Sequence, residues 1–212
     1  MPIALRDKQT ILFIGDSITD CGRRGGATPY GDGYVKFFRD LLILREPHRR
    51  VAIINKGISG DNAVGLKNRW NDDVLYHRPD WLSVKIGIND CHRFLAGVQE
   101  HGPDEFRKDY DLVLSQTREE TKAQILLIDP FYISTDRTGL GARTQVLKLL
   151  PEYISTVHDM AKKHKARLVR THDLFQKHLE STAPDFFCPE PVHPFRSGHL
   201  FIALEVMKTL TA

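Results

Sequence analysis

Five short apolar runs constrain the fold of this chain more than any other feature. The runs read as buried strands, at residues 11–14, 51–54, 81–86, 125–128 and 167–169. Between them, apolar residues recur at the three- and four-residue spacing of a helix face, within 34–42, 106–114, 146–157 and, after Pro194, 200–207. Strands that alternate with helices favour a parallel sheet covered on both faces. With right-handed crossovers, the pattern predicts an α/β fold, a three-layer α/β/α sandwich around a five-stranded parallel sheet.

Length and composition narrow the class of protein. A chain of 212 residues without a linker-like stretch predicts one domain over residues 1–212. The net charge is only +3 and the basic residues are spread along the chain, so we do not expect a nucleic-acid partner. The first ten residues lack the apolar segment of a signal peptide, and no run has the length of a membrane span. We therefore expect a cytoplasmic protein with no membrane contact.

The three cysteines support the same compartment. Cys21, Cys91 and Cys188 are odd in number, widely separated and without CxxC spacing. That pattern argues against a disulfide framework and against zinc, and it predicts reduced thiols. Cys91 and Cys188 lie close in sequence to the site candidates below, where burial is the simplest interpretation.

The first apolar run ends in Gly15-Asp16-Ser17. A hydroxyl at the carboxyl end of a buried parallel strand lies where α/β proteins bind ligands. An Asp/Ser pair after a strand is also a common helix cap. On this stretch alone, Ser17 is equally well interpreted as a nucleophile or as a capping residue.

Small polar residues follow the next two strands as well. Gly60 comes after the second run and Asn89 after the third, while His193 stands just before the last helix. The carboxyl ends of parallel strands share one edge of the sheet, so we expect Ser17, Gly60 and Asn89 to line one crevice. Gly60, Asn89 or His193 alone is more typical of a turn or loop than of a site. Their order at successive strand ends favours a site.

Acyl transfer requires these residue types. A serine hydroxyl becomes a nucleophile when an imidazole accepts its proton, and the imidazole needs a carboxylate on its other nitrogen. Glu190 precedes His193 in a turn stiffened by two prolines. A glycine amide and an asparagine side chain are suitable donors to the developing oxyanion. The predicted set is catalytic Ser17, His193 and Glu190, with Asp16 bracing the nucleophile turn and no metal or organic cofactor.

Two loops flank this constellation. Residues 21–33 contain five glycines and a proline, and residues 131–141 follow the fourth run. Turn-rich segments of this kind form substrate walls or simple surface loops with similar frequency. Phe131 and Tyr132 are correspondingly interpreted either as pocket-lining or as packing residues.

Four sequence blocks, in order, resemble the SGNH hydrolase superfamily, also called the GDSL esterases. They are GDSIT with Ser17, NKGISGD with Gly60, GIND with Asn89 and EPVHP with His193. The resemblance spans nearly the whole chain and implies a flavodoxin-like sheet of order 2-1-3-4-5. It also implies an oxyanion hole formed by the Ser17 and Gly60 amides and the Asn89 side chain.

Further phrases are similar to bacterial acetylxylan esterases, namely FIGDSITDCGR, DWLSVKIGIND and DPFYI. That likeness implies a serine esterase that deacetylates xylo-oligosaccharides or related carbohydrates through an acyl-enzyme on Ser17, and a homo-oligomer. One alternative is a lysophospholipase- or thioesterase-like member, which would need an apolar channel for its acyl chain. The other is a non-catalytic carbohydrate-binding homologue.

Glu190 departs from the superfamily pattern, which usually has aspartate at this position. Three interpretations follow: Glu190 replaces the aspartate and orients His193, a backbone carbonyl holds His193 in a Ser-His dyad, or the site is weakened or inactive. Asp185 is a distant candidate acid, disfavoured by its eight-residue separation from His193.

Overall fold

A single five-stranded parallel sheet organises the protein, whose computed structural model describes residues 2–211. The strands run in the order β2-β1-β3-β4-β5, which confirms the predicted fold class and strand order. Their bounds are β1 Thr10–Gly15, β2 Ala52–Gly57, β3 Trp81–Lys85, β4 Gln124–Ile128 and β5 Arg167–Val169. Each predicted run falls on a strand, although β2 continues beyond its run to Gly57.

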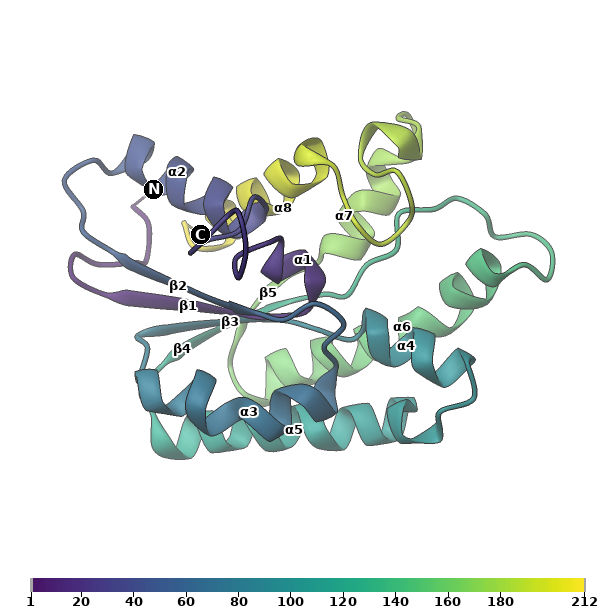
Figure 1. The fold of residues 1–212 in the computed structure, drawn as a ribbon, viewed down its shortest axis with the longest axis horizontal. Helices are drawn as coiled ribbons and strands as arrows, with labels where there is room; N and C mark the ends of the chain where they lie inside the picture. The colour runs from purple at the N-terminus through teal and green to yellow at the C-terminus, as the bar shows by residue number, and fades with distance from the viewer. Residues whose placement is uncertain (1, 212) are drawn as a thin grey trace.

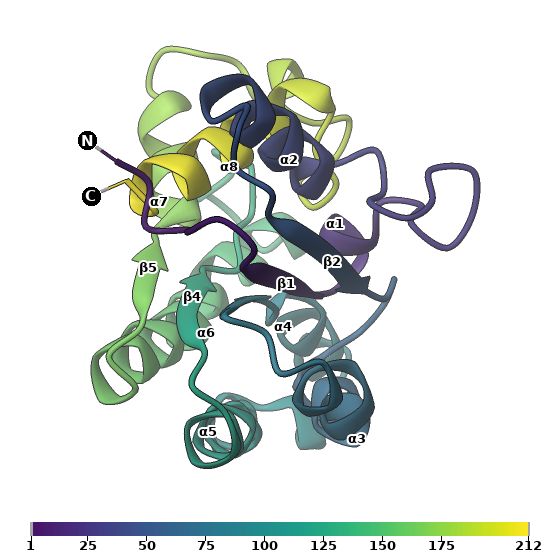
Figure 2. The ribbon, with the colours of Figure 1, turned by 90° about the vertical axis from the view of Figure 1, so that its left-hand side faces the viewer.

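Helices cover both faces of the sheet. Figures 1 and 2 show α1, α2, α7 and α8 on one face and α3, α4, α5 and α6 on the other. The helices are α1 Ser17–Asp20, α2 Tyr34–Arg45, α3 Ala63–Asp73, α4 Ile88–Leu95, α5 Pro103–Glu120, α6 Ala142–Lys163, α7 Thr171–His178 and α8 Arg196–Thr209. Short 3-10 turns occur at Leu75–His77, Gln99–His101 and Pro184–Phe186. Within residues 2–211, no helix combines the length and apolar character that crossing a bilayer would require.

The four predicted helical patterns correspond to α2, α5, α6 and α8. The remaining helices lack a dense apolar repeat. In α3 only Ala63, Leu66 and Trp70 are buried, and α4 and α7 are short. These helices form because they pack on the sheet between two strands, a tertiary effect that outweighs a weak local pattern.

Aromatic packing joins the sheet to one helix layer, and a buried hydrogen bond joins two helices of the other layer. Phe13 of β1 is fully buried and meets the rings of Tyr34 and Phe38 edge-on, at centroid distances of 5.8 and 5.2 Å. On the opposite face, Trp70 Nε1 of α3 donates to Thr117 Oγ1 of α5 at 3.1 Å. Side chains of this size each contribute about 1.5–3 kcal/mol through burial, so the sheet presents a rigid edge to the loops that follow it.

Glycines allow the carboxyl ends of the first strands to lie close to their neighbours. A Cβ on Gly15 would lie 2.2 Å from the Lys85 carbonyl oxygen. A Cβ on Gly57 would lie 2.2 Å from the Asp20 amide nitrogen, in the backbone of α1. The end of β2 can therefore pack directly against the turn that carries Ser17.

Replacing Gly57 by alanine should separate these segments. Because the new methyl group meets backbone atoms, the free energy of unfolding should fall by about 1–3 kcal/mol, as is typical of overpacking. Gly26→Ala is the matched control, since a Cβ on Gly26 would meet nothing within 4 Å. Urea denaturation of both variants measures the difference, and equal stabilities would contradict this packing.

Candidate active site

The nucleophile turn joins β1 to α1. Asp16 caps α1, and its Oδ1 accepts a hydrogen bond from the Ile18 amide at 3.0 Å. Ser17 is the first helical residue, so its amide has no acceptor within the helix and is available to another group. Asp16 is fully buried whereas Ser17 is partly exposed. The turn thus fixes the backbone and leaves the Ser17 hydroxyl accessible.

His193 and Glu190 form a continuous chain of hydrogen bonds with the Ser17 hydroxyl. Ser17 Oγ lies 2.9 Å from His193 Nε2, and His193 Nδ1 lies 2.5 Å from Glu190 Oε1. The structure therefore brings together three predicted residues that are separated by most of the chain. This is the arrangement in which an imidazole can accept a serine proton while a carboxylate fixes its tautomer.

The glutamate fits because its side chain folds back into its own turn. Glu190 Oε2 accepts from the Val192 amide at 2.9 Å, and Oε1 accepts from the His193 amide at 2.7 Å. Partial burial raises the pKa of Glu190, but these hydrogen bonds and the contact with the His193 ring outweigh it, so its pKa lies below the ordinary value. The carboxylate on His193 Nδ1 belongs to Glu190, while Asp185 lies in the separate 3-10 turn Pro184–Phe186.

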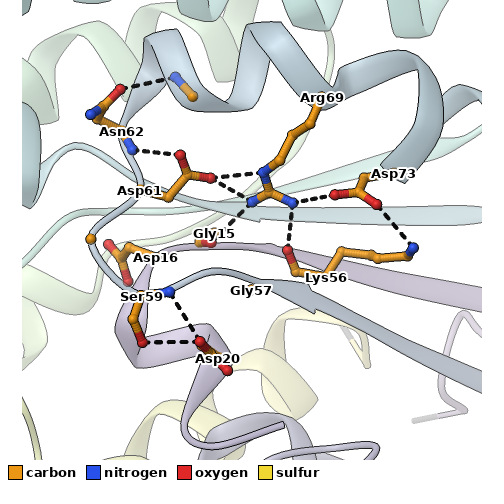
Figure 3. Close-up of polar contacts among 12 residues, drawn as sticks. Gly15, Asp16, Asp20, Lys56, Gly57, Ser59, Asp61, Asn62, Arg69 and Asp73 are labelled. Carbon is orange, nitrogen blue, oxygen red and sulfur yellow. Dashed lines mark hydrogen bonds and ion pairs between the residues drawn. The ribbon is translucent and has the colours of Figure 1, made fainter. Parts of the chain in front are cut away.

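Residues 58–62, here called the Gly60 loop, are tied to the nucleophile turn. The Ile58 amide donates to the Gly15 carbonyl at 2.9 Å. The Ser59 amide and hydroxyl both donate to Asp20 Oδ2, at 3.0 and 2.9 Å (Figure 3). Gly60 itself has φ +81°, a conformation that favours glycine, and a Cβ there would meet nothing within 4 Å. The loop is therefore anchored to the nucleophile turn just before Gly60.

Helix α4 holds the same loop from the end of β3. Asn89 Nδ2 donates to the Asp61 carbonyl at 2.8 Å, which occupies one of its two amide protons. Asp90 accepts from the Ala63 amide at 3.0 Å, and burial raises the pKa of Asp90 to about 7. Arg93 Nη2 contacts the Gly60 carbonyl at 3.3 Å. Asn89 Nδ2 donates no second hydrogen bond to a side chain or carbonyl within residues 2–211, so its other proton is available to another acceptor.

A fully buried ion pair lies beneath the nucleophile turn. Lys85, at the end of β3, places Nζ 3.1 Å from Asp16 Oδ2 and 4.8 Å from the centre of the Phe131 ring. Burial lowers the pKa of Lys85, and the Asp16 carboxylate opposes that shift. Charge and hydrogen bonds thereby hold the Asp16 carboxylate in place beneath the turn.

The structure also shows the surroundings of Phe131 and Tyr132, whose roles the sequence left open. Phe131 is fully buried and packs on Phe175 at a centroid distance of 4.9 Å, so it is a packing residue. Tyr132 is almost buried and meets the His92 ring edge-on at 6.0 Å. Burial lowers the pKa of His92, and the Glu190 charge opposes this shift.

All three cysteines are free thiols in the structure. Cys91 and Cys188 are buried, as expected from their positions, and burial raises the pKa of both. Cys21 is partly buried, with Sγ 3.6 Å from His199 Nε2. None of the three touches the Ser17 hydroxyl through a hydrogen bond among the described residues.

Sequence reasoning missed several polar residues that support the site. Lys85 did leave a signal, because it is the one charged residue in the run at residues 81–86, and a buried lysine requires a partner. Asp20 closes the GDSITD stretch but looks like an ordinary surface residue. Arg69 is one of several charged residues in α3 and is indistinguishable by sequence from a solvated one.

The sequence and fold of this chain are similar to those of known ester hydrolases. The pattern that defines the GDSL-like lipase/acylhydrolase family matches residues 13–200. The chain is 33% identical to an acetylxylan esterase of Geobacillus stearothermophilus, with 95% of this chain and 94% of that protein aligned. The crystal structure of that organism's acetylxylan esterase Axe2 is similar at 31% identity and a TM-score of 0.89, covering 99% of this chain and 97% of the other.

Two further findings come from solved structures. LAE5, an alpha/beta hydrolase enzyme from the metagenome of Lake Arreo in Spain, is 27% identical with a TM-score of 0.88, covering 99% of this chain and 98% of its own. The structures of Axe2 include three catalytic mutants, in which a serine, an aspartate or a histidine is replaced by alanine. In that enzyme the aspartate precedes the histidine by the same number of residues as Glu190 precedes His193.

Breaking the ion pair below the nucleophile turn should be costly. Lys85→Met leaves the Asp16 charge buried and unpaired, so the free energy of unfolding should fall by about 3–5 kcal/mol. The double variant Lys85→Met/Asp16→Asn removes both charges and keeps a capping side chain, so it should recover part of that loss. Urea titrations of the three proteins measure this difference. A single variant as stable as the unsubstituted protein would show that the pair is not needed.

Proposed function

The chain belongs to the GDSL-like lipase/acylhydrolase family and is a carboxylic ester hydrolase, and we propose that it removes acetyl groups from xylo-oligosaccharides or related carbohydrates. The observation that carries the proposal is the unbroken line from Ser17 Oγ through His193 to Glu190, with contacts of 2.9 and 2.5 Å. This line supplies an activated hydroxyl at an accessible edge of the sheet. The proposed catalytic residues are Ser17, His193 and Glu190.

In the first step, Ser17 forms an ester with the acetyl group. As Ser17 Oγ attacks the carbonyl carbon, His193 Nε2 accepts its proton, and Glu190 stabilises the imidazolium through Nδ1. The developing oxyanion is received by the Ser17 and Gly60 amides and the free proton of Asn89 Nδ2. When the tetrahedral intermediate collapses, His193 returns the proton to the sugar oxygen, which leaves as an alcohol.

In the second step, water takes the place of the sugar. His193 removes a proton from the water as it attacks the acetyl carbonyl of the acyl-enzyme, and the same donors hold the new oxyanion. Collapse releases acetate, and the proton on His193 passes to Ser17 Oγ. Each step needs only the residues of this site, so the proposed reaction uses no metal or organic cofactor.

The exposure of the site supports a carbohydrate as the alcohol part of the ester. The side chain of His193 is 57% exposed and that of Glu190 is 44% exposed. An open edge of this kind can admit a hydroxyl-rich oligosaccharide, whereas a lysophospholipase or thioesterase would bury a long acyl chain. The relationship to an acetylxylan esterase favours the same substrate class. The retained Ser17–His193 contact weighs against a non-catalytic binding protein.

Assembly and location complete the proposal. Helices α2 and α8 lie side by side on one face of the sheet (Figures 1 and 2) and expose apolar side chains, namely Ile43, Leu44, Leu200 and Leu204. Exposed apolar side chains on two neighbouring surface helices favour association with a second copy of the chain. The free thiols favour a reducing compartment, the cytoplasm.

The role of Glu190 can be tested with two matched substitutions. In Glu190→Gln the amide favours the wrong tautomer of His193, so kcat for an aryl acetate should fall by about 10³–10⁴-fold. Glu190→Asp keeps the charge and should lose about tenfold or less, since aspartate is a competent triad acid. A fall of only about tenfold in Glu190→Gln would instead indicate a Ser17–His193 dyad.

Substrate class is tested by comparing esters on the same protein preparation. We expect acetate release from acetylated xylo-oligosaccharides and a steep decline of kcat/KM along aryl esters from acetyl to decanoyl, because an open site does not bury a long chain. Ser17→Ala should abolish both activities. Retained hydrolysis in Ser17→Ala would overturn the assigned nucleophile, and a preference for decanoyl esters would favour the lipase-like alternative.

A further inference from the structure

We propose that Arg69 is a positioning residue, which holds the Gly60 loop in register with the nucleophile turn so that the oxyanion donors converge. This inference rests on the proposed function, because it concerns the stabilisation of the intermediate on Ser17. Arg69 lies on α3 and its side chain is only 14% exposed. It touches neither Ser17 nor His193 through a hydrogen bond among the described residues.

The Arg69 guanidinium group makes hydrogen bonds to four residues (Figure 3). Nε and Nη2 donate to Asp61 Oδ2 at 2.8 and 2.6 Å. Nη1 donates to the Lys56 carbonyl at 2.7 Å and to Asp73 Oδ2 at 2.7 Å. Nη2 also reaches the Gly15 carbonyl at 3.3 Å. Every nitrogen of the planar fork is therefore engaged, a pattern that the single ammonium group of a lysine cannot reproduce.

These contacts join the segments that the proposed reaction must align. Gly15 ends β1 and lies two residues before the nucleophile, while Lys56 lies at the end of β2. Asp61 follows Gly60 directly. One rigid group thus connects the nucleophile turn, the neighbouring strand and the Gly60 loop.

Asp61 transmits this constraint to both donors of the loop. Its carbonyl oxygen accepts from Asn89 Nδ2 at 2.8 Å, and its peptide bond links it to Gly60. Its carboxylate is held by Arg69 and also accepts from the Asn62 amide at 3.0 Å. Burial raises the pKa of Asp61 and Arg69 opposes this shift. Displacing Asp61 would therefore displace the Gly60 amide and the Asn89 side chain together.

The expected effect is on the transition state more than on substrate binding. A displacement of about 1 Å in a reacting site typically costs about 10²-fold in rate, and losing one oxyanion donor costs about 10²–10³-fold. Because the donors act on the oxyanion, which the ground-state ester lacks, KM should change little. A merely structural arginine would lower stability and leave kcat unchanged in the folded protein.

The first test is Arg69→Lys, which keeps the charge and loses the planar fork. For a short aryl acetate, kcat should fall by about 10–100-fold with KM within about threefold, measured well below the unfolding temperature. Arg118→Lys is the matched control. Arg118 donates to the Ala123 carbonyl at 2.9 Å and to the His164 carbonyl, before β4 and β5 at the opposite edge of the sheet. It should lower stability while leaving kcat unchanged.

A double-mutant cycle separates positioning from general destabilisation. If Arg69 acts through the oxyanion donors, Arg69→Lys should cost much less in an Asn89→Ala background than in the unsubstituted protein. The inference would be overturned if the kcat loss of the double variant equalled the product of the losses of the two single variants. It would also be overturned if kcat for Arg69→Lys equalled that of Arg118→Lys. Retained activity in Ser17→Ala would overturn the proposed function instead.

A second variant covers the case in which Arg69→Lys does not fold, as judged by circular dichroism. Asp61→Asn keeps an acceptor for Arg69 but removes the ionic part of the contact. It should lower kcat by about tenfold at nearly constant KM, since charged hydrogen bonds are roughly twice as strong as neutral ones. An unchanged kcat in folded Asp61→Asn would equally overturn the positioning role.

Discussion

The carboxyl ends of β1, β2 and β3 are aligned with one another in the sheet, and the rest of this structure depends on that alignment. In the sheet, Gly15 is paired with Gly57 on one side and with Lys85 on the other. The chain therefore leaves all three strands at the same height, and the nucleophile turn, the Gly60 loop and α4 emerge side by side. Glycine at two of these positions permits backbone contacts that any side chain would prevent. The proposed catalytic geometry follows from how β1, β2 and β3 align.

Two buried ion pairs then make the carboxyl edge of the sheet rigid. The Asp16 carboxylate is held by Lys85 and the Asp61 carboxylate by Arg69. Buried pairs of this kind contribute little net stability compared with apolar packing, yet breaking one is costly. In the proposed mechanism, these ion pairs contribute preorganisation. Fixed dipoles that already point at the developing oxyanion need no reorganisation during the reaction, and the exposed His193 turn can remain open to substrate.

Much of this arrangement could be predicted from sequence because it depends on local signals. Apolar runs located the strands, and the polar residues after them located Ser17, Gly60 and Asn89 along one edge. The role of Glu190 stayed open, because the absorption of its extra methylene depends on the turn that donates two amides to its carboxylate. The partners of Arg69 and Lys85 could not be predicted, since they lie on other elements and only the folded chain brings them together. Helix α3 was not predicted for a related reason, because it is buried by packing on the sheet and has no strong apolar repeat of its own.

The central claim is that an oxyanion on the Ser17 adduct is held between the nucleophile turn and the Gly60 loop. A crystal structure of the protein after reaction with an aryl alkylphosphonate tests it most directly, because the phosphonyl group mimics the tetrahedral intermediate. The proposed mechanism predicts phosphorus bonded to Ser17 Oγ. It also predicts a phosphoryl oxygen about 2.7–3.1 Å from the amide nitrogens of Ser17 and Gly60 and from Asn89 Nδ2. Phosphorus on another residue, or a phosphoryl oxygen directed away from these donors, would contradict it.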